Sequence, residues 1–215
     1  MATAALAVVL QTQGYTVSMA KPVQTGEPVG SGDASTVSEL AGINTHEFLR
    51  FPEPLAPNLA ARRAGLPQAS RQQCTEWVRR LPGADDPNHV ILVEGAGGLL
   101  VRLGDHFTLA DLAADLEAPM VVVTSLGLGS LNLVELTVGE LQRRKVDVAG
   151  LVGGSLAPDP DLATRLNLDE MVRLTGVPLW GCLPAGMGEL TPADFTVQAK
   201  SSLNLRDAFG GSRLL

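Results

Sequence analysis

The chain has 215 residues, of which 45% are hydrophobic and 18% are charged, and 23 of them are glycines. This length allows one substantial hydrophobic core but is short for two typical domains, and the composition is that of a soluble α/β protein rather than of a disordered chain. Lys and Arg number 16 against 23 Asp and Glu, so the net charge is −7, and no basic tract supports nucleic-acid binding.

The first predicted element is a helix over residues 1–13. This segment is rich in Ala, Leu and Val, contains no helix breaker and stops at Gly14, which can adopt the left-handed conformation after a helix. Its apolar part, residues 2–10, lacks the basic flank of a signal peptide and is too short to span a bilayer. The two cysteines, Cys74 and Cys182, show no metal-ligand or disulfide spacing, so we expect reduced thiols in a cytoplasmic protein.

The next segment predicts a strand, a loop and a second helix. Residues 16–19 have strand character, and we expect this strand to end at Lys21 because the proline that follows restricts the backbone there. Residues 25–32 are rich in turn formers. Asp33 then stands where it can cap a helix over residues 34–41.

The most distinctive feature is an apolar run that opens into a glycine-rich loop. Residues 55–64 and 71–81 first show the helical periodicity of surface helices. Residues 90–93 are then fully apolar and stop at Glu94, which Gly-Ala-Gly-Gly follows. This pattern is typical of a buried parallel strand whose loop presents backbone N–H groups.

The second half continues this alternation of strand and helix. Residues 120–124 and 148–152 predict two further buried strands, and residues 131–144 predict the helix between them. A helix over residues 162–175 and a short strand over residues 177–183 follow, and the remaining C-terminal residues are polar and weakly patterned. The alternation predicts an α/β fold with a parallel sheet covered on both faces and with ligands at the carboxyl ends of its strands.

Several groups at these strand ends have two interpretations each. Glu94 could hold Mg²⁺ beside a phosphate or cap the following loop; its position alone supports both equally, and the glycines that follow it favour the phosphate site. Lys21 could neutralise phosphate or carbamate charge, although a lone lysine at such a place is usually solvated. Thr25 offers a hydroxyl, and Asp33 offers a second oxygen ligand, although a helix cap is its simpler interpretation. Residues 127–130 open a helix whose N-terminus could bind a carboxylate, but spacing alone favours a tight turn.

Two motifs resemble the dethiobiotin synthetase family. They are Lys-Pro-Val-Gln-Thr-Gly at residues 21–26 and Val-Glu-Gly-Ala-Gly-Gly-Leu-Leu-Val at residues 93–101, a pairing that is highly specific. Further matches are Pro-Leu-Ala-Pro-Asn at residues 54–58, Thr-Leu-Ala-Asp-Leu at residues 108–112 and Gly-Leu-Gly-Ser-Leu-Asn at residues 127–132. The resemblance extends over residues 2–184, most of the chain.

The resemblance implies a single P-loop NTPase-like domain over residues 1–215, with a three-layer α/β/α fold and a mostly parallel sheet. It implies an enzyme of biotin biosynthesis that uses ATP and Mg²⁺ to convert 7,8-diaminopelargonate and CO2 to dethiobiotin, ADP and phosphate. In this reaction a carbamate formed on one substrate amine is phosphorylated, and the second amine then displaces phosphate to close the ureido ring. A cytoplasmic homodimer is also implied.

The resemblance assigns roles to individual residues. Lys21 would be the catalytic lysine that stabilises carbamate and γ-phosphate charge, and Asp33 and Glu94 would bind Mg²⁺. The substrate-binding residues would be Thr25, Gly129, Ser130, Leu131 and Asn132, with residues 129–132 presenting a helix N-terminus to the substrate carboxylate across the dimer interface. The nucleotide-binding residues would be Asp33, Glu94, Gly95, Ala96, Gly97, Gly154, Ser155, Leu183, Pro184 and Ala185.

The sequence departs from the family pattern in two places. The family opens with a strand and a G-x-x-x-x-G-K-T loop, which residues 1–215 do not contain, and residues 1–13 resemble the helix that follows that loop. Three explanations are a start codon assigned too late, a trimmed chain and a degenerate copy of the protein, and we favour the first, with the strand and loop encoded upstream. The alternatives are a noncatalytic dimeric homologue that binds substrate without ATP turnover and, third, a cobyrinate amidase or partitioning ATPase of the same superfamily. Gly153, Gly154 and Ser155 stand where many relatives have an Asn that reads adenine, so loose base selectivity is expected.

Overall fold

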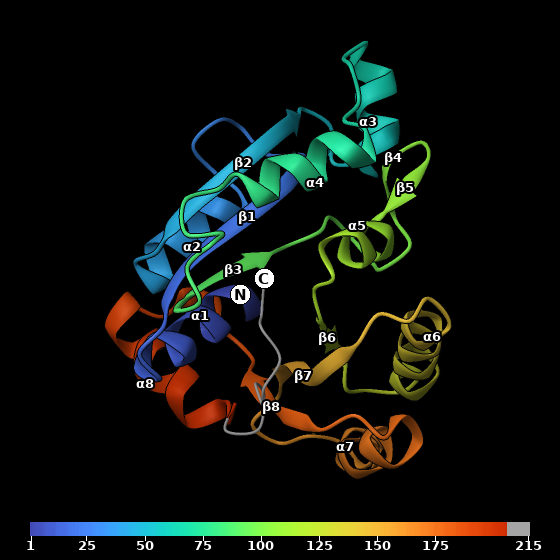
Figure 1. The fold of residues 1–215 in the computed structure, drawn as a ribbon. Coiled ribbons are helices and arrows are strands. Elements are labelled where there is room, and N and C mark those ends of the chain that lie inside the picture. The colour runs from blue at the N-terminus through green and yellow to red at the C-terminus, as the bar shows by residue number, and fades with distance from the viewer. Residues whose placement is uncertain (206–215) are drawn as a thin grey trace.

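The computed structural model describes residues 1–205, which alternate between helices and strands (Figure 1). The helices are α1 (Ala2–Thr12), α2 (Asp33–Ala41), α3 (Pro57–Ala64), α4 (Arg71–Arg79), α5 (Leu109–Leu116), α6 (Ser130–Arg143), α7 (Leu162–Thr175), the 3₁₀ helix η1 (Met187–Glu189) and α8 (Pro192–Ser202). The strands are β1 (Thr16–Thr25), β2 (Asn44–Phe51), β3 (His89–Val93), β4 (Arg102–Gly104), β5 (Phe107–Thr108), β6 (Met120–Thr124), β7 (Val148–Leu156) and β8 (Leu179–Pro184). Between residues 1 and 205, no helix is both long and apolar enough to cross a membrane.

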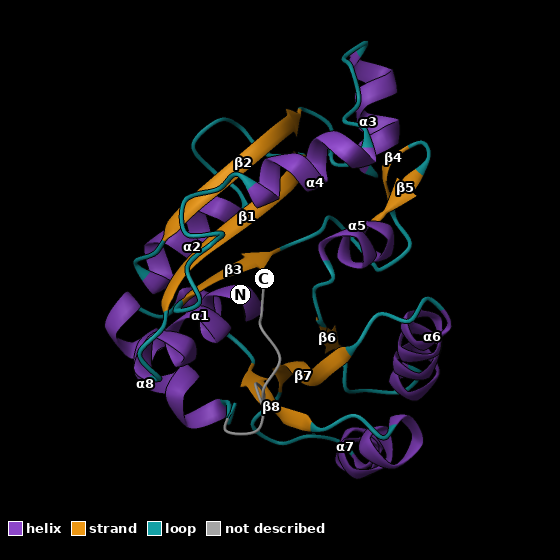
Figure 2. Ribbon diagram, in the orientation of Figure 1, coloured by secondary structure: helices purple, strands orange, loops and turns teal. Residues whose placement is uncertain are grey.

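The strands form two parallel sheets rather than one (Figure 2). β1 lies between β2 and β3 in the first sheet, β7 lies between β6 and β8 in the second, and β4 and β5 form a separate antiparallel pair. Within the described residues no ladder joins the edge strands β3 and β6, which both line a cavity of about 750 Å³. The predicted α/β fold with mostly parallel strands is therefore confirmed, but its sheet is divided between β3 and β6.

Side chains of the first sheet alternate between two helical layers. Val17, Met19 and Val90 pack in a core with α1, α2 and α8. Ala20 and Ile91 point the other way, into a core with α4 and α5. Because neighbouring strand residues face opposite sides of a sheet, this alternation covers both faces with helices and produces the three-layer arrangement, in which α4 and α8 lie on opposite sides of β1 (Figure 1).

β1 continues past its predicted end at Lys21. The ladder from β1 to β3 ends at Ala20, whose carbonyl oxygen accepts a hydrogen bond from the N–H of Glu94 at 2.9 Å. Because backbone groups alternate in direction along a strand, Pro22 faces the same side, beyond the end of that ladder. Its missing N–H therefore costs no ladder hydrogen bond, and the strand passes through the proline.

Six elements were missed by the sequence pattern, namely β2, β4, β5, α5, η1 and α8. β2 is mostly polar and half-buried along its length, so it shows no clear alternation of apolar and polar residues. α8 buries only Phe195 and Ala199, which is too few positions for a helical stripe in the weakly patterned C-terminal part. Both side chains are fully buried in the core that contains α1, so α8 is an integral part of the fold.

Replacing Phe195 by alanine is expected to lower the free energy of unfolding by about 3–5 kcal/mol, because the ring is fully buried. Chemical denaturation followed by circular dichroism measures this change. The control is Val197→Ala on the same helix, since Val197 is 69% exposed and its truncation should change the free energy by less than about 0.5 kcal/mol. Equal effects of the two substitutions would contradict the packing of α8.

Candidate active site

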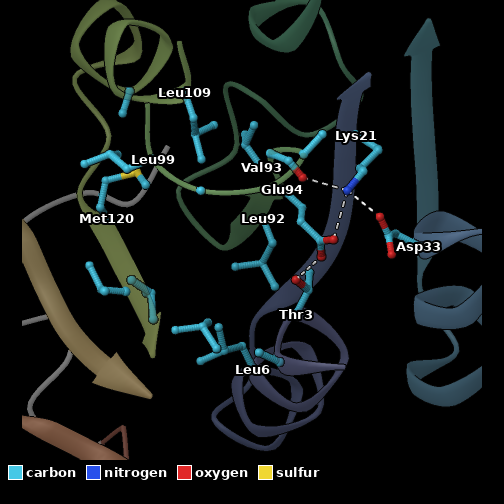
Figure 3. Close-up of a pocket in the computed structure, with 18 of the residues that line it drawn as sticks. Thr3, Leu6, Lys21, Asp33, Leu92, Val93, Glu94, Leu99, Leu109 and Met120 are labelled. Carbon is cyan, nitrogen blue, oxygen red and sulfur yellow. Dashed lines mark hydrogen bonds and ion pairs between the residues drawn. The ribbon is translucent and has the colours of Figure 1, made fainter. Parts of the chain in front are cut away.

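A buried lysine on β1 is the centre of the candidate site (Figure 3). The side chain of Lys21 is only 3% exposed, and its Nζ lies 2.5 Å from Oδ2 of Asp33 and 3.0 Å from Oε1 of Glu94. It also donates to the carbonyl oxygen of Gly95 at 2.7 Å. An ammonium group has three N–H donors, so these three acceptors satisfy it fully.

The register of the first sheet explains why these side chains meet. Ala20 pairs with Val93, so Lys21 and Glu94 follow at the same level on neighbouring parallel strands. Asp33 arrives from the start of α2, where its backbone N–H donates to Oε1 of the buried Gln24. The carboxyl ends of β1 and β3 and one helix start thus converge on the lysine.

The structure contradicts the capping interpretation of each carboxylate. The N-cap of α2 is Gly32 and no side chain caps this helix, so the simpler interpretation of Asp33 as a cap is wrong. The carboxylate of Asp33 pairs instead with the Lys21 ammonium, which is a stronger partner than a neutral backbone N–H. Glu94 likewise pairs with Lys21 and with a side chain of α1 rather than capping its own loop. Lys21 is not solvated, contrary to the usual state of a lone lysine.

Thr3 completes this arrangement and was not identified from the sequence. Its hydroxyl donates to Oε2 of Glu94, while Oε1 of the same carboxylate accepts from Lys21 (Figure 3). Both oxygens of Glu94 are therefore fixed. Thr3 is far from Glu94 in the sequence and lies in an Ala-rich helix, so no local pattern indicated the contact.

These groups open onto the cavity between the two sheets. Its lining includes seven of the predicted site residues, namely Lys21, Thr25, Asp33, Glu94, Gly95, Ala96 and Gly97. Gly97 has a φ of +82°, which favours glycine, and a Cβ on Gly95 would lie 2.7 Å from the side chain of Leu109. The turn of the loop after β3 therefore favours glycine at residue 97, and a side chain on Gly95 would require Leu109 to shift.

The other predicted site residues lie in two separate groups outside this cavity. Gly154 and Ser155 at the end of β7 lie beside Leu183, Pro184 and Ala185, since Leu156 pairs with Pro184 and accepts from the N–H of Ala185. The second group, Gly129, Ser130, Leu131 and Asn132, forms the start of α6 and the turn before it. The structure thus brings the catalytic and magnesium-binding candidates together. The residues predicted to contact the nucleotide base and those predicted to bind the substrate carboxylate lie apart from them.

Asp33 and Glu94 have the oxygen ligands that a magnesium–nucleotide complex uses. Their carboxylates converge on one cationic nitrogen, so the space between them accepts positive charge. Mg²⁺ beside a nucleotide is usually bound by one or two carboxylates together with phosphate oxygens. The described residues contain no group of three or more His, Cys, Asp or Glu that could hold a metal ion by themselves. The residues therefore fit Mg²⁺ that is bound jointly with a nucleotide.

Two of the matched motifs have structural roles. In the segment at residues 108–112, Thr108 and Asp111 form the capping box of α5, and Asp111 also accepts from Arg144. Burial alone would raise the pKa of Asp111, but hydrogen bonds from Thr108 and Arg144 lower it below its usual value. In the segment at residues 54–58, the buried Asn58 donates to Asp105 at 3.0 Å, and this bond lowers the pKa of Asp105.

The two cysteines take no part in the site. Both are free thiols, and burial raises the pKa of Cys74 to about 11 and raises the pKa of Cys182 as well. A thiol with a raised pKa carries little thiolate at neutral pH and is a poor nucleophile.

Solved structures with a similar fold include a cell division protein complex and a ParA family ATPase. The chain aligns with the MinC:MinD cell division protein complex of Aquifex aeolicus at a TM-score of 0.53 and 13% identity, covering 92% of this chain and 79% of that one. It aligns with a ParA family ATPase from Chlorobium tepidum at a TM-score of 0.52 and 13% identity, covering 93% and 90%. At this identity the likeness shows the fold alone and supports the P-loop NTPase-like architecture.

Sequence relatives identify the family. The family model described as "AAA domain" matches residues 1–190. An ATP-dependent dethiobiotin synthetase of Corynebacterium efficiens is 56% identical over 204 residues, which cover 95% of this chain and 91% of that protein. A synthetase of the same name from Rhodococcus jostii is 48% identical over 202 residues, covering 93% and 86%. With identity this high along nearly the whole chain, and with both diagnostic motifs meeting at Lys21 and Glu94, the protein belongs to the dethiobiotin synthetase family.

Proposed function

We propose that the protein catalyses the ATP-dependent ring closure of 7,8-diaminopelargonate with CO2 to dethiobiotin, with Mg²⁺ as cofactor, as a single domain in the cytoplasm. The observation that carries this proposal is the buried Lys21 ammonium, which faces a glycine-rich loop and two carboxylates at the carboxyl ends of parallel strands. This is where ligands bind in open α/β sheets. Family membership adds the substrate class.

The proposed reaction transfers one phosphoryl group and forms two bonds to carbon. One substrate amine adds to CO2 and loses a proton, giving a carbamate. A carbamate oxygen attacks the γ-phosphorus of ATP, and ADP leaves. The second amine then attacks the carbamate carbon, phosphate departs with the C–O bond electrons, and the amine loses its proton as the ring closes. Negative charge collects on the carbamate and on the transferred phosphoryl group, so a fixed cation beside both lowers the barrier.

Lys21 would supply this cation, but its three donors are already engaged. To contact a carbamate or phosphate oxygen it must give up one acceptor. The side chain of Asp33 is 48% exposed, whereas Glu94 is held on its other side by Thr3, so Asp33 is the partner with more freedom to move. Asp33 and Glu94 would hold Mg²⁺. The ion would replace the positive charge of Lys21 beside these carboxylates and would neutralise negative charge on the phosphates.

Nucleotide base contacts would come from the ends of β7 and β8. Backbone groups of Gly154, Ser155 and residues 183–185 lie together there, as the pairing of Leu156 with Pro184 requires. Backbone donors and acceptors distinguish purines from pyrimidines less sharply than an Asn side chain does. This supports the expected use of more than one nucleoside triphosphate.

The divided sheet supports the expected position of the family's first strand. A strand of about five residues is about 17 Å long, and with about 4.8 Å between strands and about 10 Å between layers it fills about 800 Å³. The cavity between β3 and β6 measures about 750 Å³ and is lined by apolar side chains that include Leu6, Val90, Leu92, Val121 and Val123. A parallel strand placed there would pair with both open edges, and a phosphate-binding loop after it would emerge beside Glu94.

A homodimer is proposed from exposed leucines around the substrate-binding turn. Leu128 lies in that turn and Leu136 lies on α6; they are 96% and 63% exposed, and neither lines the cavity between the sheets. Contact with a second copy would remove this apolar surface from water. The start of α6 would then face the partner, as the family resemblance implies.

Changing both Leu128 and Leu136 to aspartate is expected to weaken the dimer at least about a hundredfold, because each leucine buried at the interface contributes roughly 1.5–3 kcal/mol. Analytical ultracentrifugation measures the dissociation constant. Leu162 and Leu166 on α7 are both 62% exposed, and their paired change to aspartate is the control that should leave the constant unchanged. A monomeric unmodified protein at micromolar concentration, or equal effects of both pairs, would contradict this interface.

A further inference from the structure

Asn167 on α7 holds the turn that leads into α6. Its side chain is 8% exposed, and its Nδ2 lies 2.9 Å from the carbonyl oxygen of Leu126 and 2.9 Å from that of Gly127. It also lies 3.1 Å from Oγ of Ser130, the first residue of α6. One buried amide on a neighbouring helix therefore connects both halves of the turn.

These contacts fix the direction in which the turn presents its N–H groups. In a trans peptide the carbonyl of one residue and the N–H of the next point in opposite directions. With the carbonyls of Leu126 and Gly127 turned inward to Asn167, the N–H groups of Gly127 and Leu128 point outward. Neither makes a hydrogen bond with the described part of the chain. Leu128 is 96% exposed, so this outward side is open to a ligand.

The first N–H groups of α6 add to this donor surface. The N–H groups of Leu131 and Asn132 belong to the first turn of a helix, where intrahelical acceptors are lacking. Successive N–H groups at a helix N-terminus attract a carboxylate through hydrogen bonds and through the helix dipole. The direction of the preceding turn decides whether its own N–H groups join this set.

We propose that Asn167 is a positioning residue for binding the substrate carboxylate, acting through the turn of residues 126–130 rather than by touching the substrate. This inference rests on the proposed function, which supplies the substrate. Without the amide donors, the carbonyl of Leu126 loses its partner, whereas the carbonyl of Gly127 keeps the hydrogen bond from the N–H of Ser130 at 3.1 Å. The peptide group between Leu126 and Gly127 is then free to turn, and the N–H of Gly127 no longer points outward beside that of Leu128.

The test compares two ligands rather than one affinity. Binding of 7,8-diaminopelargonate and of the same vicinal diamine lacking the carboxylate is measured by calorimetry. The dissociation constant of the second ligand divided by that of the first reports recognition of the carboxylate alone. Asn167→Ala should reduce this ratio about tenfold, because hydrogen bonds to a charged group are lost. A substitution that merely loosened the fold would weaken both ligands and leave the ratio unchanged.

Asn58→Ala is the matched control, since Asn58 is also 8% exposed and donates to Asp105 away from the turn. It should leave the ratio at the value of the unmodified protein. Asn167→Ser keeps one donor in a small side chain and provides a second variant in case Asn167→Ala fails to fold. Its ratio should fall between those of the unmodified protein and Asn167→Ala. An unchanged ratio in folded Asn167→Ala or Asn167→Ser would overturn this inference. Failure of the unmodified protein to bind 7,8-diaminopelargonate would instead overturn the proposed function.

Discussion

Replacing Lys21 by methionine is expected to slow dethiobiotin formation by at least about a thousandfold. A single preorganised donor to a developing negative charge is worth about 10²–10³-fold in rate, and Lys21 would serve both the carbamate and the phosphoryl group. Its side chain is 3% exposed, so bulk water cannot replace the lost charge. Dethiobiotin is measured directly by mass spectrometry under conditions where the unmodified enzyme is active.

The same substitution also removes the partner of two carboxylates, so stability must be measured beside activity. Removing one member of a buried ion pair commonly costs about 3–5 kcal/mol, and the partly exposed Asp33 should reduce that cost here. Activity is therefore compared below the melting temperature of each variant. Lys200→Met on α8, where the lysine is exposed, is the control and should retain full activity. A folded Lys21→Met variant with more than a tenth of the normal rate would remove Lys21 from the mechanism.

Replacing Glu94 by glutamine is expected to lower the rate about 10²–10³-fold and to shift the Mg²⁺ dependence to higher concentration. The change keeps the shape of the side chain and a partner for Thr3, but it removes the charge that would attract a divalent cation. Titration of the rate with MgCl2 separates weaker cation binding from a loss of maximal rate.

The control for this charge is Glu39 on α2, which is exposed and lies on the helix that begins at Asp33. Glu39→Gln changes the net charge by the same amount and should leave the Mg²⁺ titration unchanged. If Glu94→Gln and Glu39→Gln gave the same Mg²⁺ dependence, Glu94 would not be a cation ligand.

The centre of the site could be predicted because it lies where strands end. An apolar run that stops at an acidic residue and a strand that stops near a lysine are local patterns, and parallel pairing brings their ends to one edge. Thr3 could not be predicted in this way, because its contact with Glu94 depends on how α1 packs. The state of Asp33 was misjudged for a similar reason, since capping is a local preference and the ion pair with Lys21 is a tertiary one.

The fold was predictable to the extent that burial leaves a pattern in the sequence. The buried strands β3, β6 and β7 are apolar runs and were found, and α7 has its predicted bounds. The polar strand β2, the sparse apolar positions of α8 and the continuation of β1 through Pro22 depend on neighbours that the sequence does not reveal locally. The division of the sheet between β3 and β6 likewise belongs to tertiary structure alone.

The most direct test of the account is dethiobiotin formation, with matched release of phosphate from ATP, when 7,8-diaminopelargonate and bicarbonate are supplied. Residues 1–215 are compared with a version preceded by an apolar strand and a G-x-x-x-x-G-K-T loop. Equal amounts of dethiobiotin and phosphate are expected from the extended version only, and both are expected to be lost when Lys21 is replaced by methionine. Substrate binding with no dethiobiotin from either version would contradict catalysis and leave a noncatalytic member of the family.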